Sequence, residues 1–258
     1  MSLIESKIQV GVLILSLNRP DKFNSLNREM ALQLIAELDK AAAEKNIRSV
    51  LITANGKAFC AGQDLAEAMD KNGPGIERIV HEHYNPIILR LRKLQKPVVC
   101  AVNGVAAGAG ANIALACDVV FAAKAASFIQ AFSKIGLIPD SGGTFFLPKL
   151  IGFGKASALM MLGDKVSAAD AEQMGMIYKV VDDEKLFEAA LAIASTLAQM
   201  PTKGIALTKK LLNEGTTNGL EKQLQREKEE QVVAASTYDY NEGVNAFLEK
   251  RQPLFKGE

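Results

Sequence analysis

Residues 136–144, GLIPDSGGT, place one carboxylate, Asp140, between a proline and a pair of glycines. The residues after Asp140 open a predicted helix that ends near residue 151, and aspartate is a favoured N-terminal cap. The sequence neighbours of Asp140 are largely apolar, and burial among apolar side chains would raise its pKa toward a value suited to a general base. We therefore expect Asp140 to cap a helix, to move a proton, or to do both.

Two loops rich in small residues follow apolar strands and expose backbone N–H groups. The loop 58–65 (AFCAGQDL) follows the strand predicted at 49–55, and the loop 103–111 (NGVAAGAGA) follows the strand PVVCAVN. Ligands of α/β sheets gather beyond the carboxyl ends of strands. Two N–H groups that converge on one oxygen form an oxyanion hole. Glycine-rich turns before helices also occur for packing alone, so either loop by itself leaves both interpretations open.

Several other kinds of site are disfavoured. The glycines of the loop 103–111 have neither the GK[ST] ending of a Walker loop nor the G-x-G-x-x-G spacing of a dinucleotide site. His81 and His83 point to different faces of a helix and have no nearby cluster of ligands, which predicts exposed histidines and no metal site. No G-x-S-x-G motif is present, so a nucleophilic triad is not expected.

The elements that must position these groups alternate between apolar strands and amphipathic helices, which predicts an α/β fold with crossover connections. From about residue 154 the chain becomes mainly helical. We expect a core over residues 1–196 and a helical region over 197–258, which is too thin to bury its own core and packs on the first part or on a neighbouring subunit. Strands are predicted at 8–18, 49–55, 96–104 and 118–124, and helices at 25–45, 76–95 with a kink at Pro86, 184–199, 202–213, 219–236 and 239–250.

Composition and charge narrow the class of protein. The 258 residues are 48% hydrophobic and 23% charged, with a net charge of +1, so no strong positive field would attract nucleic acid. The most apolar stretch, 97–123, is interrupted by polar residues and glycines, which argues against a membrane span. Three cysteines without metal-like spacing, and no recognisable signal peptide, predict a reduced, cytoplasmic protein.

Four motifs taken together resemble the crotonase (enoyl-CoA hydratase/isomerase) superfamily. They are NRPDKFNSLN, AFCAGQDL, AVNGVAAGAGANIALACD and GLIPDSGGT, and the similarity extends to the C-terminal EGVNAFLEKRQPLF. The resemblance implies a ββα spiral core, a C-terminal helical trimerisation region, and trimers that often pair into hexamers. It also implies an acyl-CoA thioester as substrate, so that coenzyme A enters with the substrate and no separate cofactor or metal is needed.

The resemblance also assigns site residues. The thioester oxygen would lie between the backbone N–H groups of Gln63 and Ala109. The Ala61 carbonyl would meet the CoA adenine, and Lys22 and Phe23 would line the path of the CoA. The remaining CoA and substrate contacts implied by the motifs are Gly62, Asp64, Leu65, Gly108, Asn112 and Phe132.

Departures from the family pattern indicate the reaction. Hydratases that resemble this chain carry two glutamates at the positions held here by Asn112 and Phe132, and neither side chain exchanges a proton near pH 7. Asp140 stands where many hydratases have a small residue. A single carboxylate can carry a proton from one carbon to another, which is isomerase chemistry.

Within the superfamily, the motifs around Ala109 and Asp140 are most similar to the isomerases of phenylacetate degradation. These convert 2-(1,2-epoxy-1,2-dihydrophenyl)acetyl-CoA to oxepin-CoA, and a related activity shifts a 3-enoyl double bond to the 2-position. Two alternatives stay open at this point. One is a 2-enoyl-CoA hydratase that uses Asp140 with another partner, and the other is a non-catalytic acyl-CoA-binding protein.

Overall fold

A β-hairpin begins the chain in the computed structural model, which describes residues 2–258. Strand β1 (Ile4–Gln9) pairs antiparallel with β2 (Val12–Leu17), where the sequence predicted one strand over 8–18. The two residues of the turn, Val10 and Gly11, have φ values of 46° and 78°. A two-residue hairpin turn needs such positive φ, which valine rarely adopts, and for this reason the sequence did not reveal the turn.

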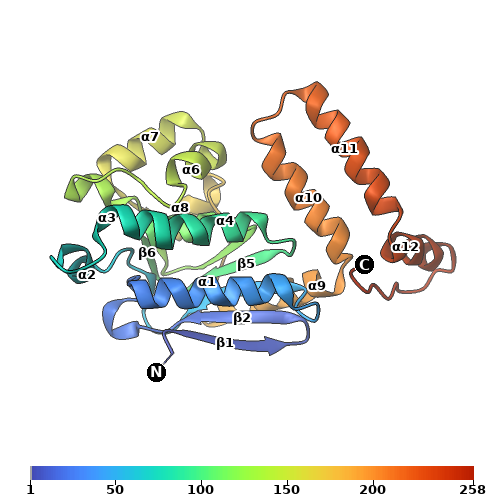
Figure 1. Cartoon of the computed structure of the whole chain (residues 1–258), viewed down its shortest axis with the longest axis horizontal. Helices are drawn as coiled ribbons and strands as arrows, with labels where there is room; N and C mark the ends of the chain where they lie inside the picture. Colours follow the sequence, from blue (N-terminus) through green and yellow to red (C-terminus); the bar gives the residue numbers. More distant parts are fainter. Residues whose placement is uncertain (1) are drawn as a thin grey trace.

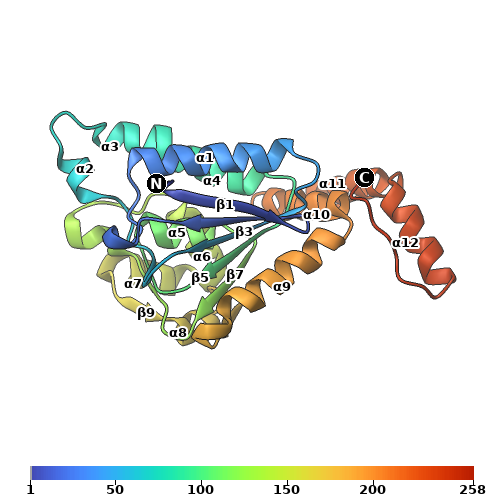
Figure 2. The same cartoon turned by 90° about the horizontal axis from the view of Figure 1, so that it is seen from below.

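The large sheet contains the buried strands that the sequence predicted. Its strand order is β1-β2-β3-β5-β7-β10, and all neighbours after β2 are parallel. Strands β3 (Ser49–Ala54), β5 (Val98–Val102) and β7 (Val119–Ala123) are almost entirely buried, because helices cover both faces of the sheet (Figure 2). Strand β10 (Lys179–Val181) forms one edge. Continuous apolar runs are typical of strands buried on both faces.

A second, smaller sheet lies in segments that were expected to be loops. Its order is β4-β6-β8-β9, and each of its strands has only three residues. Three successive strand pairs, β3 with β4, β5 with β6 and β7 with β8, place their first strand in the large sheet and their second in the small sheet. The ββα spiral implied by the resemblance is thereby confirmed. The strands are β4 (Ala58–Cys60), β6 (Val105–Ala107), β8 (Ser127–Ile129) and β9 (Lys165–Ser167).

Helices α1 and α9 cover opposite faces of the large sheet (Figures 1 and 2). Helix α1 (Arg28–Ala43) begins after Asn27, whose side chain accepts a hydrogen bond from the Met30 N–H. Helix α9 (Leu186–Gln199) packs against β3 and β5. The remaining short elements are η1 (Pro20–Lys22), α2 (Leu65–Met69), η3 (Ala131–Ile135), α6 (Gly143–Ile151), α7 (Phe153–Leu162), α8 (Ala168–Gln173) and η4 (Asp183–Lys185).

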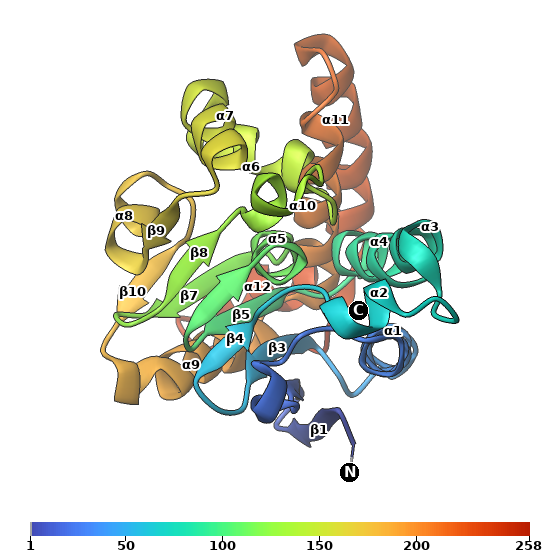
Figure 3. The same cartoon turned by 90° about the vertical axis from the view of Figure 1, so that its left-hand side faces the viewer.

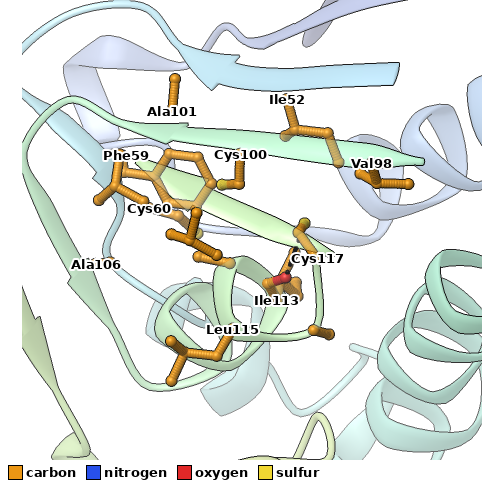
Figure 4. Close-up of a cluster of buried hydrophobic side chains, with 14 of the residues drawn as sticks. Ile52, Phe59, Cys60, Val98, Cys100, Ala101, Ala106, Ile113, Leu115 and Cys117 are labelled. Carbon is orange, nitrogen blue, oxygen red and sulfur yellow. Dashed lines mark hydrogen bonds between the residues drawn. The ribbon is translucent and has the colours of Figure 1, made fainter. Parts of the chain in front are cut away.

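Helix α5 (Ala109–Leu115) is buried along its whole length. Its Ile113 and Leu115 lie in a cluster with Phe59 of β4 and Cys100 of β5 (Figure 4). All three cysteines are buried and unpaired. Burial raises the pKa of the Cys60 thiol to about 12, so this thiol packs as a small apolar group and does not react as a nucleophile.

The helix predicted over 76–95 contains a wide turn in place of a sharp kink. It consists of α3 (Gly75–Arg78), the π-helical turn η2 (Ile79–Tyr84) and α4 (Asn85–Lys93). The Asn85 N–H donates to the Val80 carbonyl, five residues earlier. Pro86 lacks an N–H and restricts the residue before it, so the helix widens at this point.

One of the two histidines contradicts the expectation that both are exposed. His81 is exposed, whereas His83 is buried and its Nε2 lies 3.0 Å from Nη1 of Arg28. The widened turn directs His83 inward toward α1. Burial, together with the nearby Arg28 charge, lowers the pKa of His83, so this side chain is a neutral core group.

The C-terminal helices α10 (Thr202–Gly215), α11 (Leu220–Ala235) and α12 (Tyr238–Leu248) agree closely with the predicted ranges and extend away from the sheets (Figure 1). Lys209 of α10 and Arg92 of α4 both pair with Asp118, at 2.7 and 3.1 Å. The boundary expected at 196/197 falls in the last turn of α9. Among residues 2–258, no helix combines the length and apolar character that crossing a bilayer requires.

Candidate active site

A cavity of about 540 Å³ is lined by residues of α3, η2, η3 and the segment that leads into α6. Figure 3 shows the ribbons of α3, α5 and α6 in this part of the molecule. Most of its wall is apolar. Three groups that could take part in a reaction meet there: the loop of Gln63, the start of α5 at Ala109, and Asp140. The lining residues are Ala61, Gly62, Gln63, Leu65, Ile76, Ile79, Val80, Tyr84, Asn85, Gly108, Ala109, Ala131, Phe132, Lys134, Ile135, Leu137, Ile138, Pro139, Asp140, Ser141 and Gly142.

The backbone N–H groups of Gln63 and Ala109 have no hydrogen-bond acceptor within residues 2–258. On either side of Gln63, the Ala61 N–H donates to the Phe23 carbonyl (3.0 Å) and the Asp64 N–H donates to the Leu26 carbonyl (2.9 Å). The loop is thus fixed at both ends, while the amide between them stays free. Ala109 is the first residue of α5, where helical N–H groups lack an internal partner.

Glycines bring these two amides to the same cavity. Gly62 has φ of +93°, and a Cβ added there would lie 2.9 Å from the Ala107 carbonyl oxygen and 3.7 Å from the Ala109 nitrogen. Gly108 precedes α5 with φ of 52° and ψ of −126°, a conformation that side chains disfavour. Only glycines allow this close approach, and the arrangement can present two N–H donors to one oxygen.

Asp140 is half-buried in the wall of the cavity, and no cation pairs with it among the described residues. Its Oδ1 accepts a hydrogen bond from the Ser141 hydroxyl (2.9 Å). Burial raises the pKa of Asp140 to about 6, and the Ser141 hydroxyl opposes part of that rise. A carboxyl with a pKa near neutrality can both accept and return a proton at physiological pH.

The expectation that Asp140 caps a helix is wrong. Helix α6 begins at Gly143, its N-cap residue is Gly142, and no side chain caps it. The Asp140 main-chain carbonyl, not its side chain, accepts the Gly143 N–H (2.9 Å). Ser141 and Gly142 both have left-handed φ (50° and 73°), which turns the chain so that the carboxylate is left free for the cavity.

Asn112 does not line the cavity, in contrast to the expectation from sequence. It is fully buried one layer behind the wall. Its Nδ2 donates to the Asp140 carbonyl (2.9 Å), and its Oδ1 accepts from Nε2 of Gln130 (2.8 Å). Asn112 therefore holds the main chain of Asp140 from behind. Phe132, the other position that lacks a glutamate, does line the cavity.

The other expected site residues divide between the wall and its surroundings. Ala61, Gly62, Leu65 and Gly108 line the cavity. Lys22 and Phe23 lie outside this lining. Phe23 is next to it, since its carbonyl accepts the N–H of the lining residue Ala61 (3.0 Å). Phe23 has φ of 49° and is 57% exposed, so its ring is open to solvent.

Asp64 also lies outside the lining and is engaged in structural contacts. Its Oδ2 lies 2.6 Å from Nη1 of Arg19, and its Oδ1 accepts the Ala66 and Glu67 N–H groups at the start of α2. Burial raises the pKa of Asp64, but Arg19 and the two amides outweigh burial and hold it below the ordinary value. Asp64 is therefore ionised throughout the neutral range.

Tyr84 also lines the cavity and was not among the site residues expected from the sequence. It ends the π-helical turn, and its hydroxyl donates to Oε1 of Gln63. The signal in the sequence was the proline two residues later, which was expected to kink the helix but does not indicate where the aromatic ring points. Residues 2–258 contain no group of three His, Cys, Asp or Glu side chains placed to hold a metal ion.

Comparison with known proteins shows full-length similarity to one family. The enoyl-CoA hydratase/isomerase family model matches residues 7–258. The chain is 48% identical to 1,2-epoxyphenylacetyl-CoA isomerase of Escherichia coli K12, with 100% of both chains covered. It is 36% identical to 2,3-dehydroadipyl-CoA hydratase of the same organism, with 96% of both covered. The crystal structure of enoyl-CoA hydratase from Bacillus anthracis superposes with a TM-score of 0.93 at 36% identity, covering 99% of this chain and all of the other.

Proposed function

The chain belongs to the enoyl-CoA hydratase/isomerase family, and from this premise we propose that it is an acyl-CoA isomerase with Asp140 as its acid/base. The substrates proposed are 2-(1,2-epoxy-1,2-dihydrophenyl)acetyl-CoA, which would become oxepin-CoA, and 3-enoyl-CoA thioesters, which would become 2-enoyl-CoA. The relative named as an epoxyphenylacetyl-CoA isomerase supports the first, because it is similar over its whole length.

In the proposed reaction, the Asp140 carboxylate removes a proton from the carbon next to the thioester carbonyl. The electron pair left on that carbon moves into the carbonyl, and the N–H groups of Gln63 and Ala109 bind the resulting enolate oxygen. For a 3-enoyl substrate, the protonated Asp140 then returns its proton to the far carbon of the shifted double bond. For the ring epoxide, the carbon–carbon bond shared by the epoxide and the six-membered ring opens to give a seven-membered oxepin ring. The protonated Asp140 then returns its proton to a carbon of that ring, and a double bond shifts from the ring to the carbon next to the thioester. No atom is gained or lost.

One observation carries the proposal: Asp140 is the single acidic side chain among the lining residues, in a largely apolar wall with two free amides. Hydration needs a group to activate water and a group to protonate carbon. The residues at 112 and 132, where the family resemblance expects such glutamates, are a buried amide and an aromatic ring. One carboxylate with a pKa of about 6 suits a proton transfer within the substrate.

The size and character of the wall agree with a ring-bearing acyl group. Phe132 and Tyr84 supply aromatic surface, and Ile79 and Ile135 supply aliphatic surface. An apolar wall excludes water and strengthens the electrostatic interactions within the cavity. Such a wall would also disfavour the attack of water on a 2-enoyl substrate.

We also expect the protein to act as a trimer or a hexamer of identical chains. The C-terminal helices expose large apolar side chains to solvent in the single chain, including Leu220 and Leu224 of α11 and Phe247 and Leu248 of α12. Exposed large apolar side chains on helices that extend away from the sheets are consistent with protein–protein contacts. Sedimentation of the purified protein tests this expectation.

The experiment that tests the proposed function is an assay of the purified protein against ring-epoxide, 3-enoyl and 2-enoyl CoA thioesters. Chromatography with mass detection separates the outcomes, because hydration adds one water to the mass while isomerisation leaves the mass unchanged. We expect isomers from the first two substrates and little hydration of the third. Rapid hydration of crotonyl-CoA would favour the hydratase alternative, and binding without any turnover would favour a non-catalytic protein.

A further inference from the structure

Tyr84 lines the cavity and has no part in the proton transfer proposed above. Its side chain is 2% exposed, and it shares the cavity with Gln63, Ala109 and Asp140. It ends the π-helical turn η2, a rare irregularity that occurs often at functional sites. The turn ends at Tyr84, and the hydroxyl of this residue makes one specific contact.

That contact is with the side chain of Gln63. The Tyr84 hydroxyl donates to Oε1 of Gln63, and Nε2 of Gln63 donates to the Asp64 carbonyl (3.2 Å) and to Oε2 of Glu67 (3.4 Å). The Glu67 carboxylate in turn accepts the Arg28 N–H at the start of α1 (2.9 and 3.0 Å). Both ends of the Gln63 side-chain amide are thereby fixed.

The main chain on either side of Gln63 is held by one residue of the neighbouring segment. The Leu26 N–H donates to the Gly62 carbonyl (2.7 Å), and the Leu26 carbonyl accepts the Asp64 N–H (2.9 Å). These two bonds restrain the loop along one edge. The hydroxyl of Tyr84 restrains it from the side of the cavity, where the free Gln63 N–H also lies.

From this arrangement we propose that Tyr84 is a positioning residue, whose hydroxyl holds Gln63 so that its backbone N–H points at the thioester oxygen. The inference rests on the proposed function only in assigning that N–H to the oxyanion hole. Without the hydroxyl, Oε1 of Gln63 would lose its partner inside the protein, and the side chain would have to turn to find another. A small change in donor direction weakens an oxyanion hole markedly.

The role of Tyr84 is geometric and does not involve proton transfer. Burial raises the pKa of its phenol well above the ordinary value, and the charge of Asp140 adds to that rise. The hydroxyl therefore stays protonated and acts only as a hydrogen-bond donor. Its removal should leave the pH dependence set by Asp140 unchanged, which a second acid/base would not do.

The test is Tyr84→Phe, which keeps the buried ring and removes the hydroxyl. The matched control is Tyr178→Phe, since Tyr178 is 61% exposed, contacts Phe121 edge to face, and lies outside the cavity lining. Phenylacetyl-CoA labelled with carbon-13 at the thioester carbonyl is bound to the protein, and isotope-edited infrared spectra then measure hydrogen bonding to that carbonyl in the oxyanion hole. Hydrogen bonds to the carbonyl oxygen lower its stretching frequency relative to free thioester.

We expect the carbonyl stretching frequency to be lowered equally in wild type, Tyr178→Phe and Asp140→Asn. In Tyr84→Phe the frequency should be lowered by less. In turnover, Tyr84→Phe should lose roughly tenfold in kcat with little change in KM. Its pH profile should keep the wild-type acid limb. Gln63→Leu should lose at least as much, and Tyr84→Phe should add little in that background because the two side chains act through one contact.

An unchanged carbonyl frequency and an unchanged kcat in Tyr84→Phe would overturn the inference, as would the lack of any lowering in wild type. These outcomes are distinct from failure of the proposed function. Full turnover by Asp140→Asn would remove Asp140 as the acid/base, yet the carbonyl frequency would still test Tyr84. Additive losses in Tyr84→Phe and Gln63→Leu would show that Tyr84 acts through some other group, which also overturns the inference.

Discussion

Asp64, near the cavity, and Asp140, in its wall, have opposite electrostatic environments. Asp64 contacts the Arg19 guanidinium and two amides of α2, which together hold its pKa below the ordinary value despite burial. Among residues 2–258, Asp140 has one hydroxyl partner, no cation partner and mainly apolar neighbours, and burial raises its pKa to about 6. The residue type is identical, and the surroundings alone separate the two.

The difference shows how one chain assigns a structural and a chemical role to the same side chain. A carboxylate that is paired and caps a helix contributes stability and is a poor base, because its charge is already satisfied. A carboxylate left with one weak partner reduces stability when ionised and is a better base. Changes at Asp64 should therefore act mainly on folding, and changes at Asp140 mainly on turnover.

Comparing the turnover of Asp140→Asn with that of Asp64→Asn tests this division of roles most directly. We expect Asp140→Asn to lose about 10²–10⁴-fold in kcat with a nearly unchanged KM, because the variant keeps the shape but removes the base. Asp64→Asn should lose no more than about tenfold, through the position of the Gln63 loop. Steady-state kinetics with a 3-enoyl-CoA substrate measure both. Equal losses in the two variants would contradict the division of roles.

The pH dependence of kcat/KM should report the ionisation of Asp140 and not that of Asp64. Asp140 must be ionised to take a proton, so activity should rise with pH through about 6 and level off above it. At pH 5 the rate should be roughly a tenth of the plateau. The pKa of Asp64 is lowered and should add no limb in this range. A profile that stays flat down to pH 5 would contradict the proposed role of Asp140.

Much of the fold could be predicted from the sequence. The predicted ranges of the apolar strands β3, β5 and β7 and of the C-terminal helices agree with the structure to within a few residues. The three-residue strands of the small sheet are too short to show a period. The first hairpin was hidden because a valine, Val10, occupies a turn position that normally favours asparagine or glycine.

The candidate site was predictable in its main groups but not in its supporting ones. Asp140, Gln63 and Ala109 were identified from short motifs, and the structure places them on one cavity. The roles of Asn112 and Tyr84 depend on contacts across many residues of sequence, to the Asp140 carbonyl and to the Gln63 side chain. Local patterns carry no information about such contacts. The capping of α6 was mispredicted because two consecutive left-handed residues changed the direction of the chain.

Substitutions of the two aspartates should change the free energy of unfolding in opposite directions. Asp64→Ala should lower the free energy of unfolding at pH 7 by about 1–2 kcal/mol, since α2 loses its cap and Arg19 its partner. Asp140→Asn should raise it by about 1 kcal/mol at pH 8, allowing for partial exposure, because the ionised carboxylate no longer has to be buried.

The sign of the Asp140 effect follows from its raised pKa. The wild-type protein keeps the full stability of a protonated Asp140 below the unfolded pKa near 3.8 and loses it as pH rises through about 6. The gain in Asp140→Asn should therefore vanish at pH 4. Urea unfolding at the two pH values measures it. A gain that is equal at both pH values would show that burial of the charge is not its cause.

Ser141→Ala is expected to have the smallest effect, and it tests whether the hydroxyl bonded to Asp140 tunes the pKa of the base. The Ser141 hydroxyl donates to Oδ1 of Asp140 (2.9 Å) and stabilises the ionised form. Its removal should raise the pKa of Asp140 further and move the acid limb of kcat/KM to higher pH. The plateau above pH 8 should change by no more than about twofold, because the carboxylate is fully ionised there.

The matched control is Ser236→Ala, which removes a hydroxyl that donates to the Val233 carbonyl (2.7 Å) at the end of α11, outside the cavity lining. That variant should keep the wild-type limb. Both serines are replaced by the same residue, so a shift confined to Ser141→Ala must come from the lost bond to Asp140. If the limb does not move, a group other than Asp140 controls it, since no other hydrogen bond from a neighbouring side chain reaches that carboxylate in residues 2–258.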